Sequence, residues 1–243
     1  MIALVDTRLG ETEERALMLH GARVIRLPAS KRLSEAVCSH PDILIFYNDG
    51  EIITSADYIE ENPYALTDAY EWVYGLKVTC TDDAFDPKYP RDAIFNALVH
   101  AGYIFYKEDT VSHAVKEYAK RRGLKPIAVK QGYPACTTLA FGNAAITSDR
   151  GMARALLQCG IKVTLIENGD IALPPHEYGF IGGASGVYKD KVYFIGNLSS
   201  HRDGERIKKA ILDEGYTPVS LSRAPLRDLG RIIFIDECAY RDR

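Results

Sequence analysis

The chain has 243 residues, of which 47% are hydrophobic and 26% charged, and its formal net charge is -3. This length and composition suffice for a buried core without metal or disulfide support, and they exclude a disordered or fibrous protein. The mildly acidic balance argues against a dedicated nucleic-acid or anionic-membrane binder, because such proteins concentrate basic residues on one face.

The cysteines and the apolar segments indicate the compartment. No CxxC pair occurs among Cys38, Cys80, Cys136, Cys159 and Cys238, which argues against a disulfide framework or a zinc knuckle. No stretch approaches the roughly 20 apolar residues of a membrane span. The six histidines form no HxH, HxxxH or HxxE pattern. We therefore expect a cytoplasmic protein with no membrane segment, no metal and no other cofactor.

The predicted elements repeat along the chain. The first unit is expected at residues 2–27, with strand 2–5, helix 11–19 and strand 23–27. The second is expected at residues 42–81, with strands 42–47, 51–54 and 77–81 and a poor or short helix broken at Asn62-Pro63. Three clearer copies follow. Residues 92–130 contain strands 93–99, 103–106 and 126–129 and a helix capped by Asp109 or Thr110. Residues 136–166 contain strands 136–141, 144–147 and 161–166 and helix 150–158, capped by Ser148 or Asp149, and residues 182–221 contain strands 192–195 and 217–221 and a helix at roughly 202–213.

The repeated order is strand, strand, helix, strand, and the clear copies begin at Asp92, Cys136 and Gly183, 44 and 47 residues apart. The strand 231–236 is left over beside the partial N-terminal unit, as expected where a ring of repeats closes. The pattern predicts one α/β domain over residues 1–243, a propeller of five ββαβ units. The alternative is an α/β sandwich with coincidental periodicity, but a doubly wound sheet alternates one strand with one helix.

Five ββαβ units in a ring resemble the pentein fold of the guanidino-group-modifying enzymes, which include arginine deiminases, dimethylarginine dimethylaminohydrolases and amidinotransferases. An uncharacterised bacterial family assigned to that fold is similar at four segments: His40-Pro41-Asp42-Ile43, Lys130-Gln131-Gly132-Tyr133 followed by Cys136, Ile146-Thr147-Ser148-Asp149, and residues 179–186 (GFIGGASG). This resemblance runs over nearly the whole chain.

The resemblance implies a Cys nucleophile near the C-terminus, a His that opens an internal unit, and carboxylates that hold a substrate guanidinium. Here strand 231–234 contains no cysteine, and Cys238 lies beyond it. The unit expected to open with His opens with Ala135-Cys136, and Ala184 stands where an Asp is expected after Gly182-Gly183. The usual Cys-His pair is therefore absent from its expected positions.

Two other residues are the candidates for that chemistry. Cys136 opens a unit and is either a nucleophile or a small buried apolar residue. His201 precedes a helix that Ser200 could cap alone, so it is either the partner base or a residue facing solvent or a cap. Asp42 and Asp92 open units as well, where acids either hold a cationic ligand or cap turns.

The chain ends supply further binding candidates. If the ring closes, Asp6 and Arg8 meet Asp228, either as a site for an amino-acid-like zwitterion or as a structural salt bridge. Gly183 either contributes to a substrate site or serves a tight turn.

Two functions are consistent with these residues. The first is an enzyme acting on a small guanidino or amidine compound, with Cys136 and His201 as the reacting pair and Asp42, Asp92 and Asp228 binding the cation. The second is a non-catalytic relative that binds a small cationic ligand or a protein partner.

Overall fold

The fold is built on five three-stranded sheets of identical topology in the structure, a computed structural model that describes residues 1–73 and 75–236. In each, two antiparallel strands are extended by a third strand that runs parallel to the middle one. The sheets are β17-β1-β2 (Ile233–Ile235, Ile2–Asp6, Arg23–Leu27), β3-β4-β5 (Ile45–Asn48, Glu51–Ser55, Lys77–Thr81), β6-β7-β8 (Leu98–His100, Tyr103–Tyr106, Lys125–Ala128), β9-β10-β11 (Thr138–Phe141, Ala144–Thr147, Lys162–Leu165) and β13-β14-β15 (Ser185–Tyr188, Lys191–Phe194, Thr217–Ser220).

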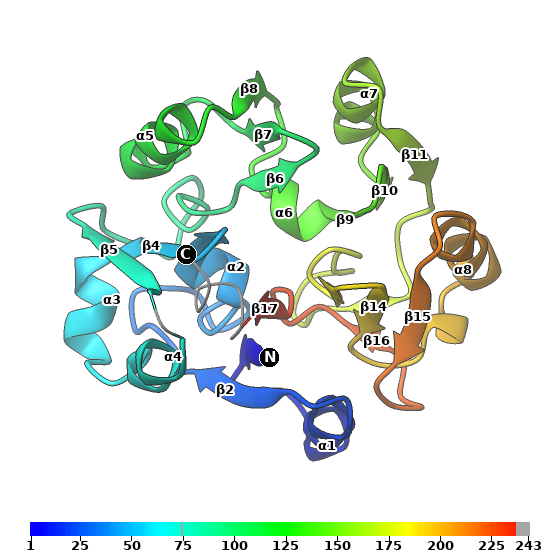
Figure 1. Ribbon diagram of the computed structural model, residues 1–243, viewed down its shortest axis with the longest axis horizontal. Coiled ribbons are helices and arrows are strands. Elements are labelled where there is room, and N and C mark those ends of the chain that lie inside the picture. Colours follow the sequence, from blue (N-terminus) through cyan, green and yellow to red (C-terminus); the bar gives the residue numbers. More distant parts are fainter. Residues whose placement is uncertain (74, 237–243) are drawn as a thin grey trace.

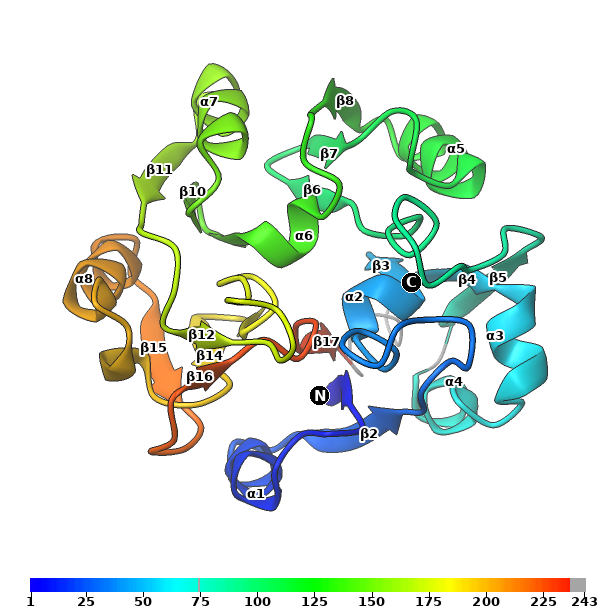
Figure 2. The same ribbon diagram turned by 180° about the vertical axis from the view of Figure 1, so that it is seen from behind.

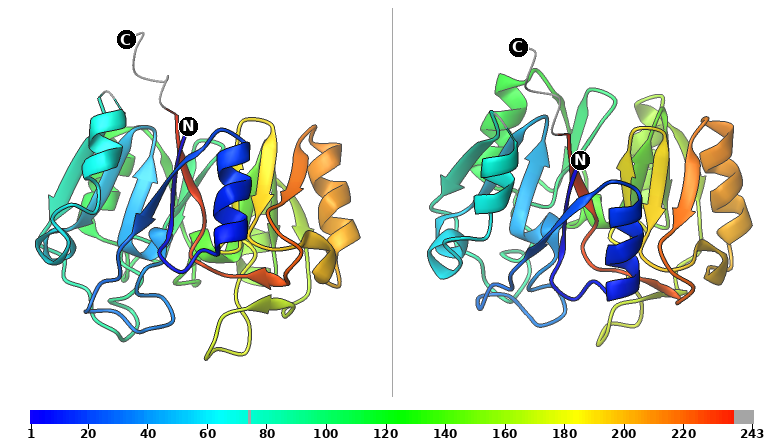
Figure 3. Two further views of the ribbon diagram at one scale, coloured as in Figure 1. Left: turned by 90° about the horizontal axis from the view of Figure 1, so that it is seen from below. Right: turned by 60° about the horizontal axis from the view of Figure 1, so that its bottom comes forward.

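Helices connect the second and third strands of each sheet and lie at the outer edge of the molecule, whereas the first strands lie toward the middle (Figure 1 and, from behind, Figure 2). The outer helices are α1 (Glu11–Leu19), α3 (Ala56–Glu61), α4 (Thr67–Trp72), α5 (His113–Arg121), α7 (Arg150–Gln158) and α8 (Gly204–Asp213). The side views show the sheets standing side by side with the helices outside them (Figure 3). None of the helices in the described residues is long and apolar enough to cross a membrane.

The two ends of the chain meet in one sheet. Strand β17 pairs antiparallel with β1, with Ala3 opposite Phe234, and β1 pairs parallel with β2. The left-over C-terminal strand thus completes the partial N-terminal unit, as the sequence predicted. This pairing brings the residues that follow β1 close to those that precede β17.

The outer helices follow from local sequence. In α7, the buried Met152, Ala153 and Leu156 recur at helical spacing and form one apolar face. The carboxylate of Asp149 accepts a hydrogen bond from the backbone N–H of Met152 at 2.7 Å, which confirms Asp149 as the N-cap.

The predicted cap of α5 is wrong. The helix begins at His113, and the N-cap is Ser112, whose hydroxyl accepts a hydrogen bond from Ala114 N at 3.1 Å. Asp109 and Thr110 lie in the turn before it, where Thr110 N donates to Lys107 O. Ser112, a polar residue closer to the first buried helical position, therefore caps the helix.

Two predicted strands begin later than expected because each is preceded by a single helical turn. Residues Pro41–Leu44 form α2 and Pro134–Thr137 form α6, so Asp42 and Cys136 lie on helical turns and not on strands. Proline favours the first turn of a helix, since its fixed φ suits that position and it has no N–H to satisfy. Both turns lie near the middle of the molecule (Figures 1 and 2).

The predicted strand 93–99 is also shorter than expected. Strand β6 begins at Leu98, and the preceding segment turns, with Asn96 N donating to Ala93 O at 3.0 Å. A short parallel pair, β12 (Ile171–Ala172) and β16 (Leu226–Arg227), was not predicted; it ties the segment before the fourth hairpin to the segment before β17.

Candidate functional site

A cavity of about 660 Å³ lies among segment 34–37, segment 173–180 and the α2 and α6 turns, and we call it the tyrosine cavity. Aromatic side chains form part of its wall: Tyr89, Tyr133, Tyr178 and Phe180. Its buried polar side chains are His40, Asp92, Cys136 and Asp228. A cavity of this size suits a small organic ligand. It unites three of the residues that the sequence singled out, from three different units.

The thiol of Cys136 is held by two polar side chains. It donates a hydrogen bond to Oδ2 of Asp42 at 2.8 Å, and its sulfur accepts one from Nδ2 of Asn96 at 3.0 Å. Asn96 fixes the turn on both sides, because its amide donates to Asp42 O and its carbonyl accepts from Ala135 N. The three side chains come from the openings of three successive units.

This arrangement keeps the thiol protonated at rest. Burial raises the pKa of Cys136 well above its ordinary value, and the neighbouring Asp42 carboxylate raises it further. Burial also raises the pKa of Asp42 to about 6, although the hydrogen bond from Cys136 and the charge of Arg231 oppose the shift. A carboxylate with that pKa is a suitable acceptor for the thiol proton near neutral pH.

Asp92 presents one oxygen without a partner. Its Oδ2 accepts a hydrogen bond from the hydroxyl of Tyr133 at 2.7 Å, while Oδ1 is buried and has no hydrogen-bond partner within the described residues. Burial raises the pKa of Asp92, and the Tyr133 hydroxyl partly offsets that effect. An unsatisfied buried carboxylate oxygen is costly, so this atom favours a bound donor.

Asp6 and Arg8 form a structural pair. Arg8 donates to both carboxylate oxygens of Asp6, at 2.9 and 2.6 Å, and to the backbone carbonyls of Glu35 and Ala36. Ser39 adds a further hydrogen bond to Asp6 at 2.8 Å. Hydrogen bonding to Arg8 holds the pKa of Asp6 below its ordinary value although burial opposes the shift. The sequence left open a zwitterion site or a structural salt bridge, and these contacts are those of a salt bridge.

His40 lies between Asp6 and Asp228. Its Nε2 is 3.8 Å from Asp6 Oδ2 and its Nδ1 is 3.9 Å from Asp228 Oδ1, both longer than a hydrogen bond. Burial lowers the pKa of His40 more than the two carboxylates raise it, so the imidazole is neutral near pH 7. The carboxylate of Asp228 accepts from the backbone N–H groups of Phe180 and Gly230, and burial raises its pKa.

Gly183 makes room for Asp228. A Cβ at this position would lie 2.0 Å from Asp228 Oδ1, and the backbone N–H of Gly183 donates to Cys136 O at 2.9 Å. Gly183 therefore belongs to the support of the site.

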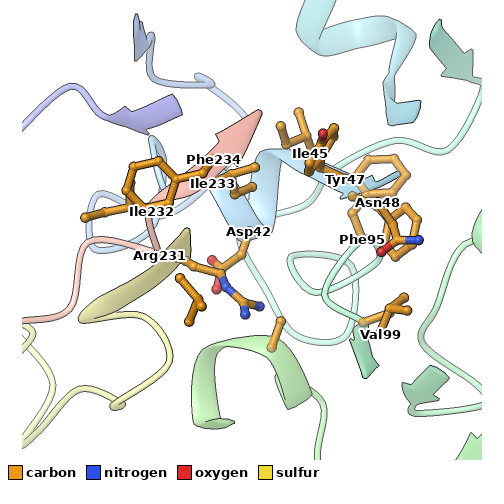
Figure 4. Close-up of a pocket in the computed structure, with 14 residues that line it drawn as sticks. Asp42, Ile45, Tyr47, Asn48, Phe95, Val99, Arg231, Ile232, Ile233 and Phe234 are labelled. Atoms are coloured by element: carbon orange, nitrogen blue, oxygen red, sulfur yellow. The ribbon is translucent and has the colours of Figure 1, made fainter. Parts of the chain in front are cut away.

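A second, smaller cavity of about 250 Å³ lies next to Asp42 and shares no lining residue with the first. Figure 4 shows the guanidinium of Arg231 beside the Asp42 carboxylate in this cavity. Arg231 has a left-handed backbone, with φ of 75°, which is uncommon for a residue other than glycine. Burial lowers the pKa of Arg231, and the Asp42 and Cys136 charges oppose that shift. Asp42 thus connects a thiol that lines one cavity with a guanidinium that lines the other.

The structure places His201 elsewhere. It lies between the short 3-10 helix η1 (Leu198–Ser200) and α8, and its Nδ1 accepts a hydrogen bond from Asp203 N at 3.0 Å. Burial lowers its pKa, with Asp170 and Asp203 as the opposing charges. Because α8 lies at the outer edge and α6 near the middle (Figure 1), His201 and Cys136 are not brought together.

Three side chains of the site were not among the sequence candidates: Asn96, Tyr133 and Arg231. Each lies within four residues of a unit opening or at the start of the left-over strand, close to the positions that marked Asp42, Asp92 and Cys136. That positional signal could have found them. Cys238 lies outside the described residues.

Within the described residues, no group of three or more His, Cys, Asp or Glu side chains could hold a metal ion.

Comparison with solved structures supports the pentein fold. The chain is similar to a dimethylarginine dimethylaminohydrolase (TM-score 0.57, 13% identity, 91% of each chain covered) and to SxtG, an amidinotransferase from Microseira wollei (TM-score 0.55, 13% identity, 93% and 78% covered). It is also similar to ArgZ, an arginine dihydrolase from cyanobacteria (TM-score 0.55, 11% identity), matching 98% of this chain and 40% of that one. At these identities the likeness establishes the fold alone.

Among curated proteins no match is found. A family profile matches residues 4–233, which is nearly the whole chain. The protein with this cysteine-carboxylate cavity therefore belongs to the family of unknown function DUF6873, and its fold is that of the penteins.

Proposed function

We propose that the protein acts on a small guanidino or amidine cation bound in the tyrosine cavity, with Cys136 as the nucleophile. The observation that carries the proposal is the hydrogen bond from the Cys136 thiol to Asp42, in a cavity that also holds the carboxylates of Asp92 and Asp228. Asp42 takes the place that the sequence assigned to His201, because it is the acceptor next to the thiol. The planar cation of the ligand suits carboxylate oxygens as partners.

The reaction balances with water as the second reactant. Oδ2 of Asp42 takes the thiol proton while the sulfur of Cys136 bonds to the central carbon of the cation, whose C=N electron pair moves to nitrogen. The tetrahedral adduct collapses, the bond from carbon to one amine breaks, and that amine leaves with the proton from Asp42. Water then adds to the same carbon and gives one proton to the Asp42 carboxylate, while its second proton goes to the released amine. The carbon–sulfur bond breaks, the proton on Asp42 returns to sulfur, and a ureido or amide product is released.

The bound cation itself promotes the first step. A positive charge next to the sulfur favours the thiolate, which burial and Asp42 otherwise disfavour. Cys136 is therefore expected to react more slowly with neutral reagents than with cationic ones.

A matched pair of alkylating reagents tests the proposal. 2-Chloroacetamidine is cationic and 2-chloroacetamide is its neutral counterpart, and mass spectrometry can map the modified cysteines. We expect Cys136 to react at least about tenfold faster with the amidine, whereas the exposed Cys80, an internal reference, reacts alike with both. Equal rates at Cys136 would overturn the proposal.

A non-catalytic binder is the second candidate. It is favoured by the 4% exposure of Cys136 and by the negative Asp42 beside it, both of which suppress the thiolate. Agmatine that binds without release of ammonia or amine, and without a covalent adduct on Cys136, would establish this second function. Release of ammonia or amine that the Cys136→Ser variant no longer catalyses would establish the first.

The proposal includes one closed domain. We propose that residues 1–243 form a five-unit propeller around the two cavities, supported by the five matching sheets and the pairing of β17 with β1. That the protein has no nucleic-acid or membrane partner remains a prediction.

A further inference from the structure

The tyrosine cavity has a one-sided charge. Its lining contains two exposed acids, Glu35 and Glu177, and two buried acids, Asp92 and Asp228, and no Lys or Arg occurs in the lining within the described residues. The two histidines of the lining are His40, which is neutral near pH 7, and the exposed His176. An anionic group entering this cavity would therefore meet like charge without a strong basic partner.

The arginine that contacts the wall at Glu35 and Ala36 is already paired. Four hydrogen bonds occupy the guanidinium of Arg8: two go to Asp6 and two to the carbonyls of Glu35 and Ala36. Its guanidinium thus holds segment 34–37 as a wall of the cavity, and it lies outside the lining.

Lys107 also lies outside the lining. Its Nζ lies over the ring of Tyr89, at 5.4 Å from the centroid, and pairs with the carboxylate of Asp109. This partly buried cation beside Tyr89 is therefore already paired with a carboxylate.

An independent observation indicates that the ligand carries a hydrogen-bond donor. Asp92 is 7% exposed, and its Oδ1 has no hydrogen-bond partner within the described residues although Oδ2 is satisfied by Tyr133. Asp92 lines the cavity, so a donor from a ligand would complete its hydrogen bonding.

We propose that the substrate is a guanidino or amidine compound without a carboxylate, whose remaining chain is neutral or carries a second positive charge. The inference rests on the function proposed above and narrows its substrate to a class that α-amino acids do not meet. The guanidinium lies between Asp92 and Asp228 near Cys136, and the far end of the molecule lies toward Glu35 and Glu177.

Three probes differ at the far end alone. Agmatine, the decarboxylated form of arginine, ends in an ammonium group. L-argininamide keeps the α-amine and has a neutral amide, and L-arginine keeps the carboxylate. Isothermal titration calorimetry with the full chain carrying Cys136→Ser, which prevents turnover, compares their affinities. We expect agmatine and L-argininamide each to bind at least about tenfold more tightly than L-arginine, a difference of about 1.4 kcal/mol.

The outcomes separate this inference from the proposed function. L-arginine binding as tightly as L-argininamide, or more tightly, would overturn the inference and leave the guanidino function standing. If none of the three probes binds, the proposed function itself fails.

A charge-reversal variant tests the placement of the far end. In Glu177→Lys we expect the preference for L-argininamide over L-arginine to shrink at least about threefold, because the new cation attracts the carboxylate. Glu205→Lys, on the exposed face of α8 and outside the lining, makes the same charge change and should leave the preference as it was. A preference that Glu177→Lys leaves unchanged would contradict the proposed orientation.

Discussion

The carboxylate of Asp42 accepts a hydrogen bond from the thiol of Cys136 at 2.8 Å, across 94 residues of sequence. Each residue follows a proline that begins a single helical turn, in α2 and in α6. The pair lies between two cavities, with Cys136 lining the larger one and Asp42 lining the smaller one beside Arg231. A change at Asp42 or Arg231 is therefore expected to alter the thiol without touching the tyrosine cavity directly.

Two measurements on Asp42→Asn report separately on the charge of Asp42 and on its role as a base. Loss of the negative charge lowers the pKa of Cys136, so the pH profile of its alkylation by 2-chloroacetamide should move down by about 1 unit. Turnover should fall at least about 100-fold, because the amide cannot take the thiol proton. Asp203→Asn, beside His201, is the control. An unchanged alkylation profile would show that Asp42 does not control the thiol.

Arg231→Met should act in the opposite direction. The guanidinium favours the ionised forms of Asp42 and Cys136, so its removal raises both pKa values. We expect the alkylation profile of Cys136 to move up by about 1 unit, and Arg231→Lys to remain closer to the wild-type profile. Identical profiles for the Met and Lys variants would mean that the charge of Arg231 does not affect the pKa of the Cys136 thiol.

The stability of the protein should depend on the titration of Asp42. Its pKa is raised from 3.8 to about 6 on folding, so the folded state binds the proton more tightly than the unfolded state. The contribution is fully present below pH 3.8 and is lost as pH rises through about 6, at a cost of roughly 3 kcal/mol. Urea denaturation from pH 4 to 7 measures this as the difference between wild type and Asp42→Asn. A difference that stays constant over this range would contradict the raised pKa.

The sequence predicted those features that depend on short-range pattern. Helix α7 and its cap Asp149 follow from apolar spacing and a carboxylate three residues before Met152, and both are confirmed. The contact between Asp42 and Cys136 depends on how separate units meet near the middle of the molecule, which no local pattern encodes. His40 and His201 both stand near turns, and the sequence alone does not say which of them lies in the tyrosine cavity.

Gly183 provides the last prediction, because its missing side chain sets the position of Asp228. A Cβ at Gly183 would lie 2.0 Å from Asp228 Oδ1, and that carboxylate is fixed by the backbone N–H groups of Phe180 and Gly230. Gly183→Ala should therefore displace Asp228, lower the free energy of unfolding by about 2 kcal/mol and weaken agmatine binding at least about tenfold. Gly151→Ala, on α7, where the nearest atom to a new Cβ is 3.0 Å away, should change stability by no more than about 1 kcal/mol and leave binding intact. If Gly183→Ala binds agmatine as wild type does, the carboxylate of Asp228 is not a ligand of the cation, and Asp92 must hold the guanidinium alone.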